Sequence, residues 1–323
     1  MPHKRIAPLL VLSSATLCVL LGFSPAAFSQ AWVPEKGEGS VSVTYQNLVA
    51  RNHLNFKGTP SKALGTVHAH STLMEFEYGI TDKLAFNADL AYIASKYNGL
   101  VPEGPSDDGF YHPTFQDVHL QVRYNVLKNP LLVTPFIGVT IPTHDYEVLG
   151  HATIGRGFHE LLVGINAGRQ LGPVLPNVYL QGRYSYSILK RFEGFNLNRS
   201  NAEWEVGWLA NRKLILRFLG AGQKSYDGLN LPIDLHSEDD HEIHDRVARA
   251  DFARLGGGAT FSVSKTFDIH LAYAKTVWGR NIHAVRGVAI GFSWRFSRGF
   301  DLSKMPTTSS SRSSMPTAGQ SLF

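Results

Sequence analysis

The sequence predicts an all-β protein: an antiparallel, up-and-down transmembrane β-barrel of about twelve strands, with short periplasmic turns and long external loops. The clearest observation is the last predicted strand, residues 285–296, in which large apolar residues alternate with small or polar ones. Successive side chains of a strand point to opposite faces, so this strand has one apolar and one polar wall. Two further observations are the repeat of strand-like segments of roughly ten residues, which suits tilted membrane strands, and the alternation of short and long connections between them.

Residues 1–29 have the features of a secretory signal peptide. Lys4 and Arg5 precede an apolar run at residues 6–23, and the small residues Ala27 and Ser29 offer a cleavage site before Gln30. The alternative, an uncleaved membrane anchor, is disfavoured because the apolar run is short and small residues follow it. Cys18, the single cysteine, lies in this run, so the mature chain is expected to form no disulfide and to have no thiolate chemistry.

The composition of the remaining chain agrees with β structure. The formal net charge of +5 becomes +3 when Lys4 and Arg5 are subtracted, and the basic residues are scattered. This distribution gives no support for a nucleic-acid partner. No later segment has about 18 unbroken apolar residues, so a second membrane helix is not expected. The 30 glycines and the aromatic content of 11% favour strands and turns over long helices.

The first half of the barrel is expected to contain six strands. They are predicted at residues 40–49, 67–78, 84–93, 117–124, 131–141 and 158–168. The strand at 117–124 has the most regular alternation, with Val118, Leu120 and Val122 opposite Asp117 and His119. In the strand at 131–141, a proline occupies position 135 and cannot donate a ladder hydrogen bond, which weakens the case for that strand.

The second half is expected to contain six more strands and to close the barrel. They are predicted at residues 178–186, 201–208, 214–223, 254–264, 267–273 and 285–296, and the longest loop at 224–250. The last strand must pair with the first, because an unpaired backbone edge cannot face lipid. The barrel domain is thus predicted at 30–296, followed at 297–323 by a disordered, Ser/Thr/Pro-rich tail on the periplasmic side.

Aromatic residues gather near the two ends of the predicted apolar faces. Those at the short-turn end are Tyr78, Tyr124, Trp208 and Trp294, and those near the other end are Tyr92, Tyr186 and Tyr273. Two aromatic girdles at the membrane interfaces account for this placement. The alternative is a soluble β-sandwich with aromatic residues in its core, but such a fold has no reason to alternate short and long connections.

If the apolar faces meet lipid, ionisable residues on the opposite faces line the lumen. The candidates are Glu75, Glu77, Asp89, Asp117, His119, Arg123, Arg183, Glu203, Glu205, Arg217, Asp268, His270 and Arg295, and Glu160 shares their face. Both signs are present, so we expect these side chains to form structural ion pairs and to constrict the lumen. A selectivity filter is the alternative interpretation.

No metal, cofactor or catalytic site is predicted. Residues 236–245 contain metal-ligating residue types, but their spacing, His-x4-His-x2-His, matches no tight zinc signature, and we expect a solvated external loop. An outer-membrane hydrolase needs a serine, a histidine and an orienting partner in contact. His270 with Ser185, or His144 with Asp145, are the candidates, and no nucleophile motif accompanies either pair.

Four segments carry a resemblance to a known family: residues 37–45, 78–84, 115–124 and 276–281. Together they resemble the outer-membrane β-barrel family of transporters of the MetA pathway of phenol degradation. The resemblance spans most of the mature chain and lies in turns and strand ends rather than in a binding site. It implies the passage of small aromatic or hydrophobic compounds.

The sequence therefore predicts a passive channel for small molecules in the outer membrane of a Gram-negative cell. Its expected partners are outer-membrane lipid, lipopolysaccharide, a small-molecule cargo and the barrel-insertion machinery. That machinery is expected to read Gly291, Trp294 and Phe296 in the last strand, which resemble the closing-strand signal of bacterial outer-membrane proteins. The alternatives are a closed barrel with a structural or surface-interaction role and, third, an outer-membrane hydrolase.

Overall fold

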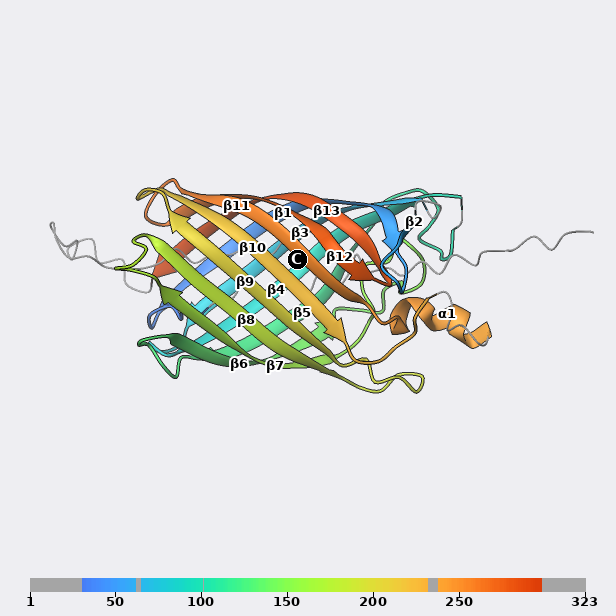
Figure 1. Ribbon diagram of the computed structural model, residues 1–323, viewed down its shortest axis with the longest axis horizontal. Helices are drawn as coiled ribbons and strands as arrows, with labels where there is room; N and C mark the ends of the chain where they lie inside the picture. The colour runs from blue at the N-terminus through green and yellow to red at the C-terminus, as the bar shows by residue number, and fades with distance from the viewer. Residues whose placement is uncertain (1–30, 62–64, 101, 232–237, 298–323) are drawn as a thin grey trace, which may run out of the picture.

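A closed barrel of long, tilted antiparallel strands forms the body of the computed structural model (Figure 1). The structure describes residues 31–61, 65–100, 102–231 and 238–297. The predicted signal peptide at 1–29 and the predicted tail, apart from Ser297, lie outside the described residues.

Thirteen strands and one helix follow each other along the described parts of the chain. The elements are β1 (Glu38–Leu54), β2 (Pro60–Ser61), β3 (Thr66–Gly79), β4 (Leu84–Asn98), β5 (His112–Tyr124), β6 (Leu132–Pro142), β7 (Glu160–Gln170), β8 (Val178–Leu189), β9 (Arg199–Leu209), β10 (Leu214–Ser225), α1 (Glu238–Val247), β11 (Asp251–Ser262), β12 (Phe267–Arg280) and β13 (Ile282–Ser297). β2 has two residues and pairs only with the end of β1, so the wall consists of the other twelve strands.

The first and last strands close the ring. Each wall strand pairs with its neighbours in sequence, and β13 pairs with β1 from Glu38 opposite Ser297 to Leu54 opposite Ile282. Every backbone edge of the wall is thereby paired, as a barrel in lipid requires. The predicted fold class, an antiparallel barrel of about twelve strands, is confirmed.

The alternating residues sort between the two faces of the wall as predicted. On β1, Val41 and Val43 are 38% and 41% exposed, whereas Ser42 and Thr44, which alternate with them, are 3% and 0% exposed. On β13, the exposed row contains Phe292 and Trp294. The outer surface is therefore apolar, and most of the polar alternates point inward.

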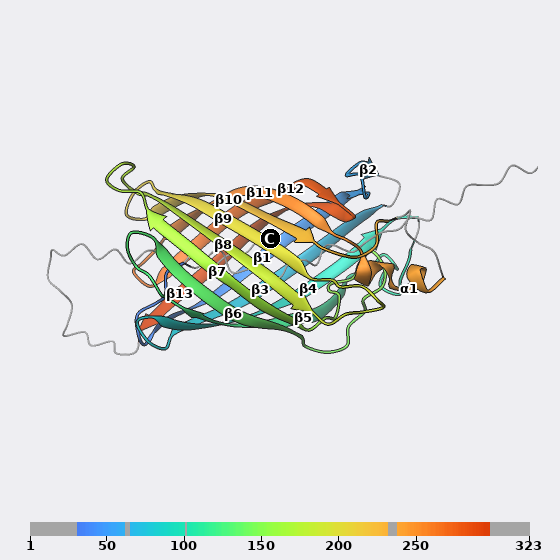
Figure 2. The same cartoon turned by 60° about the horizontal axis from the view of Figure 1, so that its bottom comes forward.

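The aromatic residues at the strand ends lie on the outer surface. Tyr124, Trp208 and Trp294 are 46%, 50% and 55% exposed at the end of the barrel with the short connections, which we call the short-turn end. Tyr92 and Tyr273 are exposed toward the opposite end, which we call the long-loop end. Figures 1 and 2 show the loops and α1 gathered at this long-loop end.

Several strands extend further at the long-loop end than their alternation predicts. β4 continues to Asn98 and β12 to Arg280, whereas the alternation ends at 93 and 273. Beyond the apolar band both faces of a strand can be polar, so periodicity does not mark these extensions. One connection at this end is short, although the sequence predicts long ones here. Only Asn281, which has a positive φ of 51°, separates β12 from β13.

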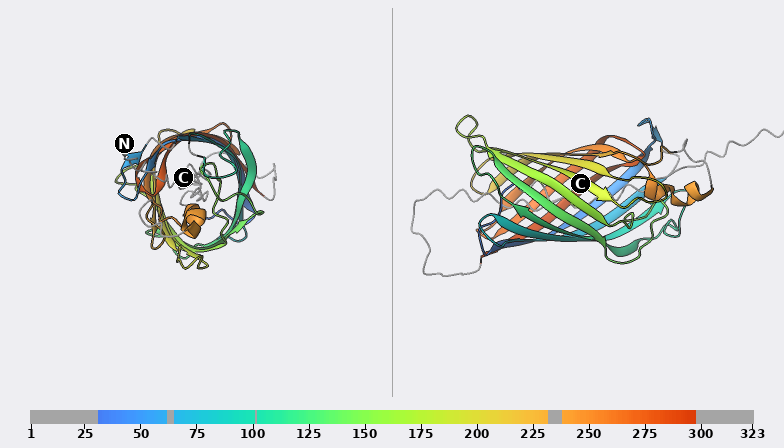
Figure 3. Two further views of the ribbon diagram at one scale, coloured as in Figure 1. Left: turned by 90° about the vertical axis from the view of Figure 1, so that its right-hand side faces the viewer. Right: turned by 90° about the horizontal axis from the view of Figure 1, so that it is seen from below.

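The prediction that residues 224–250 form only a loop is wrong, because α1 lies within them. His244 and Arg246 lie in the last turn of the helix, where basic side chains suit the negative end of the helix dipole. The segment has no apolar stripe of helical period, so its sequence did not reveal a helix. Seen along the barrel axis, α1 lies inside the outline of the ring (Figure 3). None of the helices among the described residues is long and apolar enough to cross a membrane.

Candidate functional site

The ionisable residues predicted to line the lumen are all partly or fully shielded by the barrel. Eight of the thirteen are buried: Glu77, His119, Arg123, Arg183, Glu205, Arg217, Asp268 and His270. The other five are half-buried: Glu75, Asp89, Asp117, Glu203 and Arg295. Their strands alternate them with exposed apolar residues, so these side chains point toward the interior.

Six of these residues form three ion pairs inside the barrel. Arg123 pairs with Glu77. Arg217 lies 3.8 Å from Glu205, and Arg295 lies 3.1 Å from Asp268. A fourth buried pair, Arg199 with Glu160, lies closer to the long-loop end. The three pairs include six of the thirteen predicted residues, so the charged wall is neutralised in part.

The two histidines among the predicted lumen residues bind hydroxyl groups. Nδ1 of His119 is 2.8 Å from Oγ1 of Thr140. Nε2 of His270 is 2.7 Å from Oγ of Ser293, and its Nδ1 is 3.0 Å from Oγ1 of Thr260. None of these three contacts includes the carboxylate that orients the histidine of a catalytic triad.

The two histidine pairs considered for a hydrolase do not form. The partners of His270 are Ser293 and Thr260 rather than Ser185. The ring nitrogens of His144 lie 2.8 Å from the hydroxyl of Thr114 and 2.9 Å from that of Thr143, so the contacts of His144 are with these threonines rather than with Asp145.

Three acidic residues differ from the ion-paired set. Glu75 and Asp89 face each other in register on β3 and β4. Both carboxylate oxygens of Glu75 and Oδ1 of Asp89 are buried and accept no hydrogen bond from protein atoms. Glu203 and Asp89 border a cavity of about 60 Å³ in the barrel interior, which has room for several water molecules.

The cavity has a wall of mixed charge. Arg183 borders it between the acidic residues, donates a 2.7 Å hydrogen bond to Oε1 of Gln121 and lies 3.8 Å above the ring of Phe136. Asn87, His119, Glu160 and Arg199 complete much of its polar lining. The middle of the barrel thus contains a cavity with many polar lining residues and room for water.

The connection between β6 and β7, residues 143–159, folds inward and closes the long-loop end. The hydroxyl of Tyr146 donates a 2.6 Å hydrogen bond to Oδ1 of Asp117 on the barrel wall. Asp107, from the connection between β4 and β5, accepts hydrogen bonds of 2.8 Å from the backbone amides of His151 and Ala152. Burial, and then the neighbouring Asp117, raise the pKa of Tyr146, so the phenol keeps the proton that it donates.

Two apolar clusters seal this inward-folded connection. The first joins it to β1, β3 and β4 and contains, among others, Leu73, Ile93, Tyr97, Tyr146 and Ile154. The second joins α1 to the strand ends and contains, among others, Leu197, Leu231, Val247, Phe252 and Ile282. The connection at 143–159 and α1 are therefore held at the long-loop end by apolar packing as well as by hydrogen bonds.

The chain before β1 crosses the short-turn end. Thr134 on β6 donates a 2.6 Å hydrogen bond to the carbonyl of Ala31, and Trp32 packs edge-on against Tyr179 on β8 at 5.9 Å. A Cβ atom on Gly168 would lie 2.6 Å from Ala31 and 2.8 Å from Trp32, so only glycine at this position admits the segment. The interior is consequently restricted at both ends.

Several residues of this site were not found from the sequence. Glu103 and Asp107 lie in a connection that has no periodic pattern. Tyr179 is buried and donates a hydrogen bond to Glu205, but nothing in the sequence around it indicated that its side chain points inward. Arg199 stands next to the alternating segment at 201–208 and could have been found by extending that alternation by two residues.

Comparisons with known proteins establish the fold. No protein-family model matches the chain, so the resemblance to the phenol-degradation family stays a prediction. No curated protein matches it either.

Among solved structures, the COG4313 outer membrane channel from Pseudomonas putida F1 matches with a TM-score of 0.62 and 11% sequence identity, covering 82% of this chain and 98% of that one. At this identity the match shows a common barrel fold and nothing finer. The translocator domain of the autotransporter NalP from Neisseria meningitidis has a TM-score of 0.47 at 10% identity, with 81% and 90% covered. The P. putida toluene transporter TodX has a TM-score of 0.42 at 10% identity, with 84% and 92% covered.

Proposed function

We propose that this protein is a passive channel for small molecules in a Gram-negative outer membrane. The apolar outer surface, the aromatic residues at both ends and the closed ring of strands support a membrane location. The solved barrel of similar fold is described as an outer membrane channel, which favours the same class of function here.

One observation carries the proposal: the buried carboxylates of Glu75 and Asp89 have oxygens without a protein hydrogen bond, and Asp89 borders the interior cavity. In a barrel with only a structural role, buried polar atoms are expected to be satisfied by the protein itself. Carboxylates that depend on water for their hydrogen bonds belong to a hydrated path. This observation favours a channel over the closed structural barrel.

The restrictions at the two ends bear on the cargo. A molecule entering at the long-loop end must pass the connection at 143–159, which packs on the wall through buried apolar residues, before it reaches the cavity in the middle of the barrel. This restricted access favours a small cargo, in agreement with the small aromatic or hydrophobic compounds that the family resemblance implies. Passage requires the connection at 143–159 to move, because its hydrogen bonds and apolar contacts fill the entrance.

Single-channel recording in planar bilayers tests the proposal. The wild-type protein is expected to give small or infrequent steps, and a variant with residues 147–156 replaced by a short Gly/Ser linker is expected to give larger, regular steps. A matched control replaces residues 55–59, at the same end of the barrel, with a Gly/Ser linker of equal length. If neither the wild type nor the 147–156 variant conducts while both reconstitute as folded barrels, the channel proposal is wrong and the structural barrel is favoured.

A further inference from the structure

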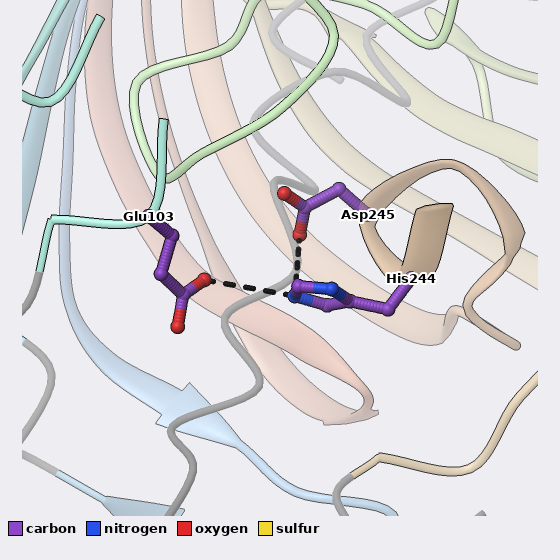
Figure 4. Close-up of side chains that lie close together, drawn as sticks. All are labelled: Glu103, His244 and Asp245. Atoms are coloured by element: carbon purple, nitrogen blue, oxygen red, sulfur yellow. Dashed lines mark ion pairs between the residues drawn. The ribbon is translucent and has the colours of Figure 1, made fainter. Parts of the chain in front are cut away.

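Three metal-ligating side chains converge at the long-loop end, outside the lumen wall. Glu103 comes from the connection between β4 and β5, and His244 and Asp245 come from the last turn of α1 (Figure 4). Oε2 of Glu103 lies 3.6 Å from Nε2 of His244, which lies 3.1 Å from Oδ1 of Asp245. The three ligand atoms are all within 4.8 Å of one another.

The carboxylate of Asp245 gives a second, independent indication of a ligand. Its side chain is 2% exposed. Oδ2 accepts a 2.7 Å hydrogen bond from the backbone amide of Gly150, which fixes the orientation of the group. The other oxygen, Oδ1, is buried and faces the cluster, with Nε2 of His244 3.1 Å away. When Nε2 of that imidazole carries no proton, it donates no hydrogen bond to Oδ1, and a cation placed beside this buried carboxylate oxygen stabilises it.

We propose that Glu103, His244 and Asp245 bind a divalent transition-metal ion, with Zn²⁺ preferred. Zn²⁺ takes histidine nitrogen and carboxylate oxygen at about 2.0–2.2 Å in tetrahedral geometry, which separates neighbouring ligand atoms by roughly 3.3–3.5 Å. The observed separations of 3.1 and 3.6 Å bracket this range, so only small side-chain adjustments are needed. The mixture of imidazole and carboxylate favours Zn²⁺ over the all-oxygen sites of Ca²⁺ and Mg²⁺.

His151 lies beside this group without belonging to it. Its Nε2 lies 3.7 Å from the same Oε2 of Glu103, but it is not among the three side chains whose ligand atoms all lie within 4.8 Å of one another, and its ring stacks on Tyr97 at a centroid distance of 4.0 Å. A water molecule is therefore the expected fourth ligand. A bound ion would join the β4–β5 connection to α1, and Gly150 in the β6–β7 connection donates a hydrogen bond to Asp245.

A protonated His244 between two carboxylates is the competing explanation of the same geometry. In that case the cluster is an ordinary ion-pair group and has no particular affinity for metal. Metal binding differs because it needs a neutral imidazole and ionised carboxylates and releases any proton that they hold. The two explanations therefore differ in a direct binding measurement, which does not depend on whether the barrel conducts.

The experiment is a Zn²⁺ titration of the full-length barrel in detergent, after stripping with EDTA, in competition with a chromophoric chelator. We expect one equivalent of Zn²⁺ to bind with micromolar or tighter affinity. His244→Ala and Asp245→Asn are each expected to weaken that affinity at least tenfold. His112→Ala is the matched control, because His112 contacts Asp108 at 2.8 Å in an exposed pair at the same end and is expected to leave the affinity unchanged.

Two further measurements guard against unfolded variants and surface binding. Circular dichroism must show the same β content in all proteins. X-ray absorption on the Zn²⁺-loaded wild type is expected to show nitrogen and oxygen ligands at about 2.0–2.2 Å. The proposal is overturned if stripped wild type binds no stoichiometric Zn²⁺, or if His244→Ala and His112→Ala bind it equally.

Discussion

Arg123 on β5 and Glu77 on β3 form an ion pair across β4, which separates their two strands in the barrel wall. Their side chains are 0% and 5% exposed. Ala85, the residue of β4 in register with Arg123, is small and buried, so the guanidinium can lean over it toward Glu77. The contact connects alternate strands and therefore adds to the barrel a cross-link that the backbone ladder does not provide.

Removing one member of this pair is expected to destabilise the barrel. Glu77→Gln leaves the Arg123 guanidinium buried without its countercharge, which typically costs about 3–5 kcal/mol. The free energy of unfolding, measured by urea titration in detergent, is expected to fall by that amount. Glu38→Gln, at an exposed position on β1, is the control and is expected to change it by less than about 0.5 kcal/mol. Equal effects of the two substitutions would show that the pair contributes no particular stability.

The hydrogen bond between Tyr146 and Asp117 is expected to hold the entrance closed. Tyr146→Phe removes the hydroxyl that reaches Asp117 and that also accepts a 3.2 Å hydrogen bond from the amide of Gly157. The connection at 143–159 should then leave the entrance more often, so the fraction of time spent in conducting states should rise severalfold in planar bilayers. Tyr124→Phe, on the outer surface at the short-turn end, is the control. An unchanged open fraction for Tyr146→Phe would mean that this hydrogen bond does not hold the closure.

The strands of the barrel wall could be predicted from the sequence because the alternation of side chains between two faces depends only on residues next to each other in the chain. Alternation in β13 distinguishes Trp294 from Ser293 residue by residue, and the same rule separates Val122 from Arg123 on β5. Strand pairing then follows from the short turns. Alternation places Glu77 and Arg123 on the same face, but the relative height of two strands decides that they meet, and periodicity does not specify that height.

The way in which loops fold over the long-loop end could not be predicted, because the contacts that hold them join loops far apart in the sequence. Asp107 binds the backbone of His151 and Ala152, far along the chain, and neither segment has a periodic pattern. The polar α1 likewise takes its position from packing of its last turn, where Val247 is fully buried. A spacing rule based on neighbouring histidines missed the group of Glu103, His244 and Asp245 for the same reason: one of its ligands comes from another connection.

The acidic residues at the cavity are expected to set the charge preference of the channel. Asp89→Asn removes a negative charge from a wall in which Arg183 and Arg199 remain. Rings of carboxylates favour cations in a pore, so this loss should shift the reversal potential in a salt gradient toward anion selectivity. Asp82→Asn, in an exposed short turn, is the control and should not shift the potential. A reversal potential unaffected by Asp89→Asn would place the conducting path away from this cavity.

Phe296 is expected to be the residue of the closing strand on which assembly depends most. Its ring lies 6.2 Å from that of Phe76 and 5.7 Å from that of Trp294. A Cβ atom on Gly39, its partner in register, would lie 2.7 Å from the ring, so Gly39 leaves the space that Phe296 covers. Phe296→Ala removes this anchor at the seam where β13 meets β1, and the yield of folded barrel in the outer membrane should fall severalfold.

Phe218→Ala separates a specific assembly role from general loss of an aromatic side chain. Phe218 is 51% exposed on the outer face of β10, away from the seam, and packs on Trp204 at 5.2 Å. Its substitution should reduce the yield much less than Phe296→Ala does. A chain ending at Ser297 keeps the whole of β13 and should assemble as well as the full-length protein. If that truncated chain fails to assemble while retaining Phe296, the signal for assembly lies in residues 298–323 rather than in the closing strand.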